Sequence, residues 1–296
     1  MDTWYFETAV IFRNALLLST LLCNTESWVG LTGKEVEVLE KVDEQLLRRI
    51  LSAHSKTAIP ALYLELGCVP IRFLVMQRRI GFLHYILNED SESLIREVFD
   101  AQLAHPLKGD WCGQVKGDLE KLGLDVSLET LARWSEKELK SHLKSAVNCE
   151  AYKFLSDSKQ DKSKIRDLKY SDLQLQPYLR AGRTTTIQEK CHIFKSRTRM
   201  LDLRANFKVG QVDLRCTKCD TGEEETQPHL LTCPGLSDTS VVTVVPEYEQ
   251  LLDQDPDRVE KLGRILQQKF NMFKSDSLLV PGDRSFAAAV SATEGN

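Results

Sequence analysis

Hydrophobic side chains in residues 1–155 recur every three or four positions, which is the period of an amphipathic α-helix. The first such segment covers residues 5–23, and a second begins at Thr32, where Glu35 can complete a capping box. In the second segment the expected buried stripe consists of Val36, Leu39, Val42, Leu46 and Ile50. Further helices are predicted over residues 58–66, 70–88, 91–103, 110–122 and 135–155. The sequence therefore predicts an all-helical array with short connections over residues 1–155.

The pattern changes after residue 155. Residues 156–163 are rich in Ser, Lys and Asp and predict a solvated linker, which begins a basic helical connector over residues 156–205. Alternating apolar and polar residues over 203–214 indicate a strand or hairpin. The remaining predicted parts are a small zinc module with three cysteine ligands and one histidine ligand over residues 206–240, a terminal helix within 241–275 starting near Pro246, and a disordered tail over 276–296. The expected fold class is mainly α.

Charge is unevenly distributed along the chain. Of the 296 residues, 42% are hydrophobic and 28% charged, which is ordinary for a globular protein. The formal net charge of −4 argues against a protein that coats nucleic acid uniformly. Residues 180–219, however, contain ten Lys or Arg against three acidic residues. This local excess of positive charge indicates a polyanionic partner near the zinc module.

The cysteines indicate a reducing compartment. Eight cysteines in a chain of this length are too few for a disulfide-rich secreted scaffold. Five are dispersed among apolar helical positions, where we expect reduced, buried thiols: Cys23, Cys68, Cys112, Cys149 and Cys191. Polar residues, among them Glu7 and Arg13, interrupt the apolar run over residues 6–23, so neither a signal peptide nor a membrane span is expected. We therefore expect a nuclear or cytoplasmic protein that is not secreted.

The other three cysteines form a metal-binding pattern with one histidine. Cys216 and Cys219 are separated by two residues, a spacing that places both thiolates on one ion in a tight turn. His229 and Cys233 are four positions apart, so on a helix their side chains share one face. Four sulfur and nitrogen ligands with no open position are typical of one structural Zn²⁺ rather than of a catalytic metal.

A short helix is predicted to carry the second ligand pair. Thr226 can cap it and Pro228 fits its first turn. The acidic residues 223–225 are expected to be solvated in the loop before it. Two alternatives to zinc stay open, namely a chance grouping of the four residues and a disulfide between Cys216 and Cys219, which a reducing compartment disfavours.

Three stretches together carry a resemblance to a known family. They are residues 17–47, residues 62–87, and residues 225–234 with the sequence ETQPHLLTCP. In this order they resemble the C-terminal part of the polymerase polyprotein of LINE-type, non-LTR retrotransposons, over residues 5–275. The resemblance implies a helical thumb over residues 1–155, followed by a basic connector and a zinc module.

The resemblance also limits the expected activity. In that family the catalytic aspartates lie in an Asp-Asp motif of the palm, and this sequence contains no Asp-Asp pair. The pattern of the endonuclease that follows the zinc module in some family members is not convincingly present either. No nucleophilic Ser/His/Asp or Cys/His arrangement and no phosphate-binding glycine loop occurs. We therefore expect no enzymatic activity and no small-molecule substrate, except as part of a longer reverse transcriptase polyprotein.

Basic residues on two predicted helices and the segment that follows are candidates for contacts with a phosphate backbone. The candidate residues are Arg78, Arg79, Lys195, Arg197, Arg199, Arg204 and Lys208. The alternative for each is a solvated helix face. Two function classes follow: a nucleic-acid-binding remnant of a retrotransposon polymerase that contacts RNA or DNA, or a protein-interaction module whose zinc only stabilises a helical scaffold. An intact RNA-directed DNA polymerase of which this chain is a fragment is a third reading.

Overall fold

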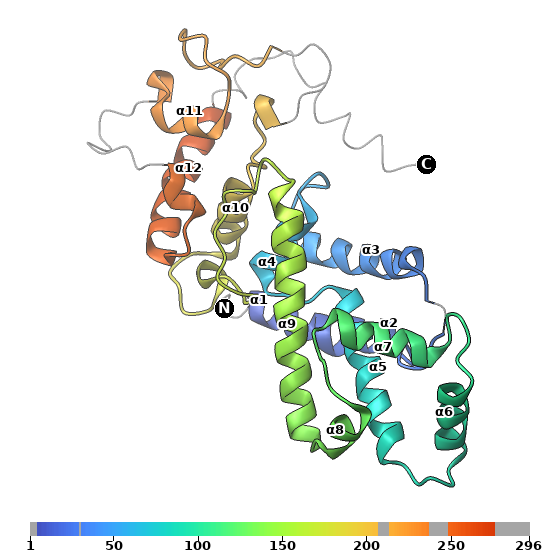
Figure 1. The fold of residues 1–296 in the computed structure, drawn as a ribbon. Coiled ribbons are helices and arrows are strands. Elements are labelled where there is room, and N and C mark those ends of the chain that lie inside the picture. The colour runs from blue at the N-terminus through green and yellow to red at the C-terminus, as the bar shows by residue number, and fades with distance from the viewer. Residues whose placement is uncertain (1–4, 30, 207–212, 237–247, 276–296) are drawn as a thin grey trace.

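A computed structural model describes residues 5–29, 31–206, 213–236 and 248–275 of the chain, and these are mainly helical (Figure 1). The first part contains α1 (Tyr5–Phe12), the π-helical η1 (Arg13–Leu17), α2 (Leu18–Leu21), α3 (Gly33–Ile50), α4 (Ile59–Leu66), α5 (Ile71–Asn88), α6 (Leu94–Ala104), α7 (Trp111–Lys121), α8 (Leu128–Arg133) and α9 (Glu136–Gln160). The second part contains η2 (Pro177–Leu179), α10 (Ile187–Arg197), η3 (Arg204–Asn206), α11 (Gln227–Thr232), η4 (Pro234–Leu236), η5 (Tyr248–Leu252) and α12 (Pro256–Ser275).

Local capping signals place the helix starts correctly. The Thr32 side chain accepts a hydrogen bond from the Glu35 amide, and the Glu35 carboxylate accepts one from the Thr32 amide, which completes the predicted capping box of α3. The predicted box at the start of α9, between Ser135 and Glu138, is also present. Gly67 ends α4 with a φ of 63°, a conformation that glycine adopts without steric cost.

The buried face of α3 differs from the predicted stripe. Val42 is 42% exposed, whereas Glu40 and Asp43 are buried and ion-paired. Asp43 accepts hydrogen bonds from Arg13 of η1 at 2.5 and 2.6 Å, and Glu40 accepts them from Arg72 of α5 at 2.6 and 2.8 Å. These partners lie on other helices, so the period of α3 alone could not reveal which of its faces is buried.

One main core joins the helical array to the segment that follows it. The long α9 packs against α4 and α5, and it continues to Gln160, beyond the predicted start of a solvated linker at residue 156. After the helix, Ile165, Leu168 and Leu179 are buried in the same core as the array. Residues 161–186 therefore pack on the array as part of one structural unit.

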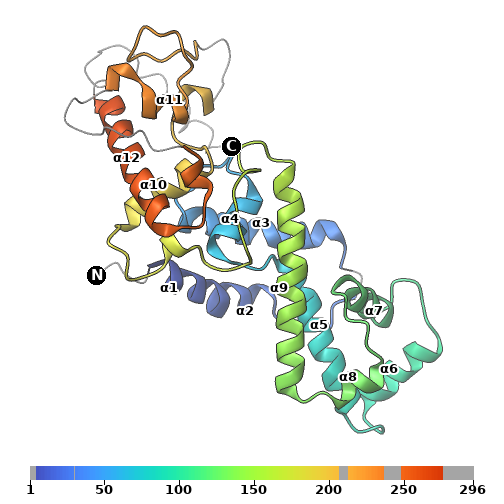
Figure 2. The same ribbon diagram turned by 60° about the vertical axis from the view of Figure 1, so that its left-hand side comes forward.

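A second, smaller core lies at one end of the molecule. Leu230 and Leu231 of α11 pack there with Leu262 and Leu266 of α12, and the thiols of Cys216 and Cys233 belong to the same cluster. Figures 1 and 2 both show α11 and α12 at this end and α6 at the other, with α9 running between them. The terminal helix and the Cys/His module thus share a core.

Three predicted features of the second part differ or fall outside the described residues. No strand occurs in the described part of residues 203–214; η3 occupies its start, and residues 207–212, with Lys208, lie outside the described ranges. The long terminal helix begins at Pro256 rather than near residue 246. The predicted tail over 276–296 is also outside the described ranges. Among the described helices none is by itself long and apolar enough to cross a membrane, although the bent pair of α4 and α5 passes by length and composition.

Candidate metal centre

The Cys/His module is built from a turn and a short helix that face each other. Leu214 accepts a backbone hydrogen bond from Glu225 at 2.7 Å, and Cys216 donates one to Glu223 at 2.7 Å, which closes the loop between the two ligand pairs. Thr226 caps α11 by accepting a hydrogen bond from the His229 amide, as predicted. The loop and the capped helix together bring the four predicted ligands to one place.

The four ligand side chains converge closely enough to hold one metal ion. The ligand atoms of Cys216, Cys219, His229 and Cys233 all lie within 4.8 Å of one another. The Sγ atoms of Cys216 and Cys233 are 3.8 Å apart, and Cys219 Sγ lies 3.3 Å from His229 Nε2. All eight cysteines of the chain are free thiols, so the structure contains no disulfide between Cys216 and Cys219. Cys216, His229 and Cys233 are buried.

Glu223 fixes the orientation of the histidine. Its carboxylate oxygen Oε2 lies 2.5 Å from His229 Nδ1, while His229 Nε2 faces Cys219. A metal-bound histidine commonly donates its second ring N–H to a carboxylate, which sets the tautomer and leaves the other nitrogen free for the ion. The sequence interpretation placed residues 223–225 in solvent. Glu225 is instead buried and accepts a hydrogen bond from the Arg204 amide at 2.9 Å.

The surroundings shift the acidity of two thiols in opposite directions. Hydrogen bonding from Thr221, whose hydroxyl oxygen lies 3.1 Å from the Cys219 sulfur, lowers the pKa of Cys219 to about 6. Burial raises the pKa of Cys233 to about 12. A divalent cation between the sulfurs favours the thiolate form of each ligand, so metal binding by this set releases protons.

A close backbone approach supports the last ligand. A Cβ atom placed on Gly235 would lie 1.7 Å from the carbonyl oxygen of Lys218, so only glycine fits there. Lys218 lies between the first two cysteine ligands, and its amide donates to Cys216 Sγ at 3.4 Å. Gly235 therefore lets the chain after Cys233 pack directly on the turn that carries Cys216 and Cys219.

Replacing Glu223 by Ala is expected to weaken metal binding while leaving all four ligands in place. Loss of a carboxylate partner of a metal-bound histidine costs about 10- to 100-fold in affinity. We expect the low end, about tenfold, because the Glu223 side chain is 63% exposed. Competition with a chromophoric chelator measures the affinity. Glu224→Ala is the matched control, and equal affinities of the two variants would contradict the assigned role of Glu223.

Two of the predicted phosphate-binding arginines are buried, which corrects the sequence interpretation. Arg197 Nε donates to Glu65 at 2.9 Å, and its Nη1 donates to the backbone carbonyls of Leu251 and Asp253. Arg79 pairs with the buried Asp118 at 2.9 Å. Neither guanidinium can reach a phosphate without unfolding its surroundings, because each already neutralises a buried carboxylate.

The other predicted basic residues that the structure describes, Arg78, Lys195, Arg199 and Arg204, are partly exposed. Arg78 donates to the carbonyl of Leu22 and lies 3.6 Å from Glu26. Arg199 lies 3.7 Å from Asp167, and Arg204 lies 3.6 Å from Glu225. Lys195 is half-buried on α10. Lys208 lies outside the described residues.

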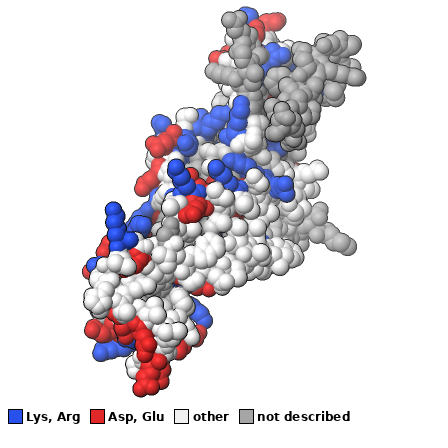
Figure 3. Space-filling model, turned by 90° about the vertical axis from the view of Figure 1, so that its right-hand side faces the viewer, with Lys and Arg blue, Asp and Glu red and all other residues white. Residues whose placement is uncertain are grey.

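Basic residues from three distant segments converge near α10, and sequence reasoning missed most of them. Lys56 and Arg199 both lower the pKa of Lys164, after burial as the largest cause. The pKa of His54 is lowered mainly by burial; Lys56, Lys164 and Arg48 lower it further, and Asp202 acts in the opposite direction. We call Arg48, Lys56, Lys164 and Arg199 the basic surface. Figure 3 shows Lys and Arg side chains gathered on the middle and upper part of one face. The signal in the sequence was the local charge of residues 48–56 and 162–169.

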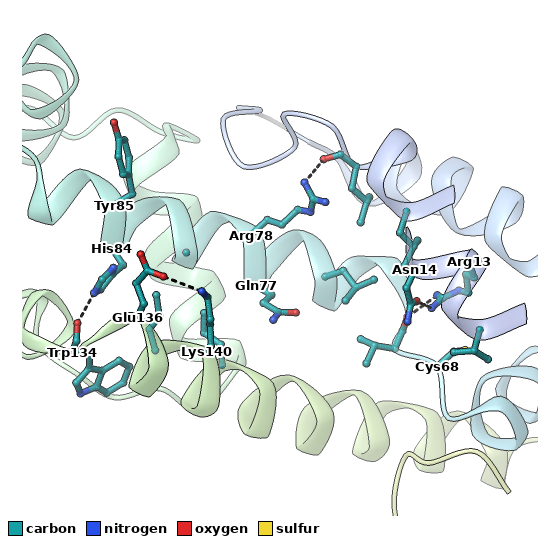
Figure 4. Close-up of a pocket in the computed structure, with 18 of the residues that line it drawn as sticks. Arg13, Asn14, Cys68, Gln77, Arg78, His84, Tyr85, Trp134, Glu136 and Lys140 are labelled. Carbon is teal, nitrogen blue, oxygen red and sulfur yellow. Dashed lines mark hydrogen bonds and ion pairs between the residues drawn. The ribbon is translucent and has the colours of Figure 1, made fainter. Parts of the chain in front are cut away.

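A cavity lies between α1, η1, α2, α5 and α9, far along the chain from the metal ligands (Figure 4). Its volume is about 880 Å³, and apolar side chains such as Leu18, Leu74 and Leu139 line it. The charged groups on its wall are paired within the chain, including Lys140 with Glu136 at 2.9 Å. The cavity is thus lined largely by apolar side chains, and its charged residues are already paired within the chain.

The remaining cysteines do not join the metal cluster. Cys68 and Cys191 are buried as expected, whereas Cys23 and Cys149 are exposed, contrary to the expectation of buried thiols. In the part of the chain that the structure describes, the four predicted ligands are the one group of three or more such side chains close enough to share an ion. No protein-family model matches the chain, and neither a curated protein nor a solved structure matches it.

Proposed function

We propose that the metal is one structural Zn²⁺. Two Zn–S bonds of about 2.3 Å at a tetrahedral angle place their sulfurs about 3.8 Å apart, and a Zn–S and a Zn–N bond place sulfur and nitrogen about 3.5 Å apart. The separations here are 3.8 Å between Cys216 and Cys233 and 3.3 Å between Cys219 and His229. Three thiolates and one imidazole are the ligand types that zinc takes in closed, structural sites.

We further propose that the chain binds RNA or DNA through its phosphate backbone at the basic surface. The observation that carries this proposal is that basic residues of three segments far apart in the sequence lie together. Lys164 Nζ lies 3.5 Å from the carbonyl oxygen of Arg199. Arg48 donates to the carbonyls of His54 and Thr57, on the segment that carries Lys56. Asp167 and Asp202 offset part of this positive charge, and the remaining excess attracts an anion. Contacts of this kind depend on charge and shape rather than on base identity.

The resemblance to retrotransposon polymerases supports the same proposal. On this view residues 1–155 are a thumb-like domain, residues 156–205 are the connector, and the zinc module stabilises the end of the connector. The role is binding rather than catalysis, because phosphoryl transfer of the polymerase type needs paired carboxylates that hold metal ions. The burial of Arg79 and Arg197 favours the alternative, a protein-interaction module without a nucleic-acid role.

Salt-dependent binding separates these alternatives. Each neutralised phosphate of a duplex contributes about −0.9 to the slope of log affinity against log salt concentration. Combining Lys56→Ala, Lys164→Gln and Arg199→Gln is expected to reduce the slope by about 2.7 on any duplex sequence. Fluorescence anisotropy with labelled RNA and DNA duplexes measures it.

The matched control combines Lys116→Ala, Lys137→Ala and Lys144→Ala, three exposed lysines on α7 and α9. The slope of log affinity against log salt concentration is expected to fall less in this control than in the triple variant. Absence of binding at low salt, or an identical slope for wild type and the triple variant, would contradict the nucleic-acid proposal and favour the interaction-module alternative. Zinc content measured on each variant confirms that the fold of the module is retained.

A further inference from the structure

Helix α6 exposes an apolar stripe at the end of the molecule opposite the metal centre. Leu94 is 75% exposed and Val98 is 49% exposed, and these two residues lie one helical turn apart with Ala101 continuing the same face. Phe99 is the one residue of α6 that is buried. An exposed apolar helix face in a folded domain indicates an interaction surface when a pocket adjoins it.

Such a pocket lies directly beside the stripe. Its volume is about 160 Å³, and it is lined by Ser27, Val29, Phe82, Val98, Phe99, Gln102 and Trp111. Trp111 packs edge-to-face on Phe82 and on Phe99, with ring centroids 5.7 and 6.3 Å apart, which holds the aromatic floor rigid. An apolar cavity of about 150 Å³ accommodates a benzene molecule, so this pocket fits one bulky apolar side chain.

The surroundings of the pocket are acidic. Residues 89–110 contain six acidic residues against two basic ones. Glu97 is exposed on α6, and Asp100, which pairs with Arg96 at 3.1 Å, keeps half of its side chain exposed. Figure 3 shows acidic side chains gathered at the lower end of the molecule, where α6 lies in Figure 1. The field at this surface therefore attracts a cationic partner and repels nucleic acid.

We propose that α6 and the aromatic pocket form a docking site for a basic amphipathic helix of a partner protein. The apolar face of that helix lies on Leu94 and Val98, and one of its aromatic or leucine side chains enters the pocket. Its Lys or Arg residues face Glu97 and Asp100. A second copy of this chain is disfavoured as the occupant, because it would bring the same acidic segment against itself. The site is independent of the zinc module and of the basic surface.

Binding of three designed helical peptides to the full 296-residue chain tests this site. All three share an apolar face with Leu, and they carry Trp with Lys flanks, Trp with Glu flanks, or Ala in place of Trp with Lys flanks. Fluorescence anisotropy is expected to show the tightest binding for Trp with Lys flanks. Removing the Trp anchor weakens binding about thirtyfold, as for a buried hot-spot side chain, and exchanging Lys for Glu weakens it about tenfold.

Variants of the chain locate the bound peptide. Val98→Asp is expected to weaken binding of the peptide that carries Trp with Lys flanks about tenfold. Val38→Asp, at an exposed helical valine on α3, is expected to leave this affinity unchanged. Glu97→Lys should weaken binding of the Lys-flanked peptide and strengthen binding of the Glu-flanked one, a gain that loss of folding cannot produce. Equal binding of the three peptides, no binding of any, or an unchanged affinity in Val98→Asp would overturn the proposal. Concentration-dependent dimerisation that Val98→Asp abolishes would also overturn the proposal, because a second copy of this chain would then occupy the docking site.

Discussion

Loss of the metal is expected to unfold the module over residues 213–236 and to loosen α12, while the main core stays folded. Structural zinc sites contribute on the order of 10 kcal/mol to local folding at neutral pH. The thiols of Cys216 and Cys233 lie in the same small core as Leu262 and Leu266 of α12, so the effect spreads to that helix. The large core around α4, α5 and α9 has no contribution from the ligands.

Hydrogen exchange followed by mass spectrometry measures this effect by segment. Cys216→Ser, His229→Ala and the chelated wild type should all exchange fast over residues 213–236 and faster than wild type over α12, with α4 and α9 unchanged. Cys149→Ser, which replaces an exposed thiol outside the cluster, is the control and should behave as wild type. Unchanged protection of α11 in metal-free protein would mean that the module folds without an ion.

Replacing Arg197 by Ala is expected to destabilise the whole chain by about 3–5 kcal/mol, the usual cost of removing one partner of a buried ion pair. Glu65 accepts hydrogen bonds from Arg197 at 2.9 Å, from Tyr170 at 2.8 Å and from Tyr178 at 2.9 Å. Both charged side chains are buried, so the variant leaves the carboxylate of Glu65 without its cation in a desolvated site. The loss also frees the carbonyls of the segment before α12 that Arg197 holds.

Urea denaturation followed by circular dichroism gives the free energy of unfolding. Arg258→Ala is the control, because Arg258 pairs with Asp253 and Asp255 at the surface, with its own side chain 63% exposed. Exposed pairs of this kind contribute about 0–1 kcal/mol. A loss below about 1 kcal/mol in Arg197→Ala would show that the buried pair is not essential and would reopen a surface role for this arginine.

The features that the sequence predicted correctly are those encoded by neighbouring residues. Capping boxes and the cap at Thr226 depend on side chains three positions apart, and their geometry follows from the helix itself. The grouping of Cys216 and Cys219 with His229 and Cys233 also follows from short spacings. The structure confirms both kinds of prediction because they depend on residues close together in the sequence and not on what the helix packs against.

The features that the sequence did not reveal depend on partners distant in the chain. The basic residues around Arg197 predict a phosphate ligand, whereas its actual partner, Glu65, lies 132 positions away in the sequence. The burial of Asp43 has no local signal either, because its partner Arg13 belongs to another helix. Lys56 and Lys164 meet only through tertiary packing. Glu223 had a local signal, an acidic residue in the loop before His229, but its contact with the ring is formed only in the folded chain.

The metal content of the reduced protein tests the central claim most directly. Elemental analysis of the purified 296-residue chain is expected to give one zinc per molecule. X-ray absorption at the zinc edge should then show three sulfur neighbours at about 2.3 Å and one nitrogen neighbour at about 2.0 Å. A metal-free protein from a reducing, zinc-supplemented preparation, or a zinc bound mainly by oxygen, would contradict a site made of Cys216, Cys219, His229 and Cys233.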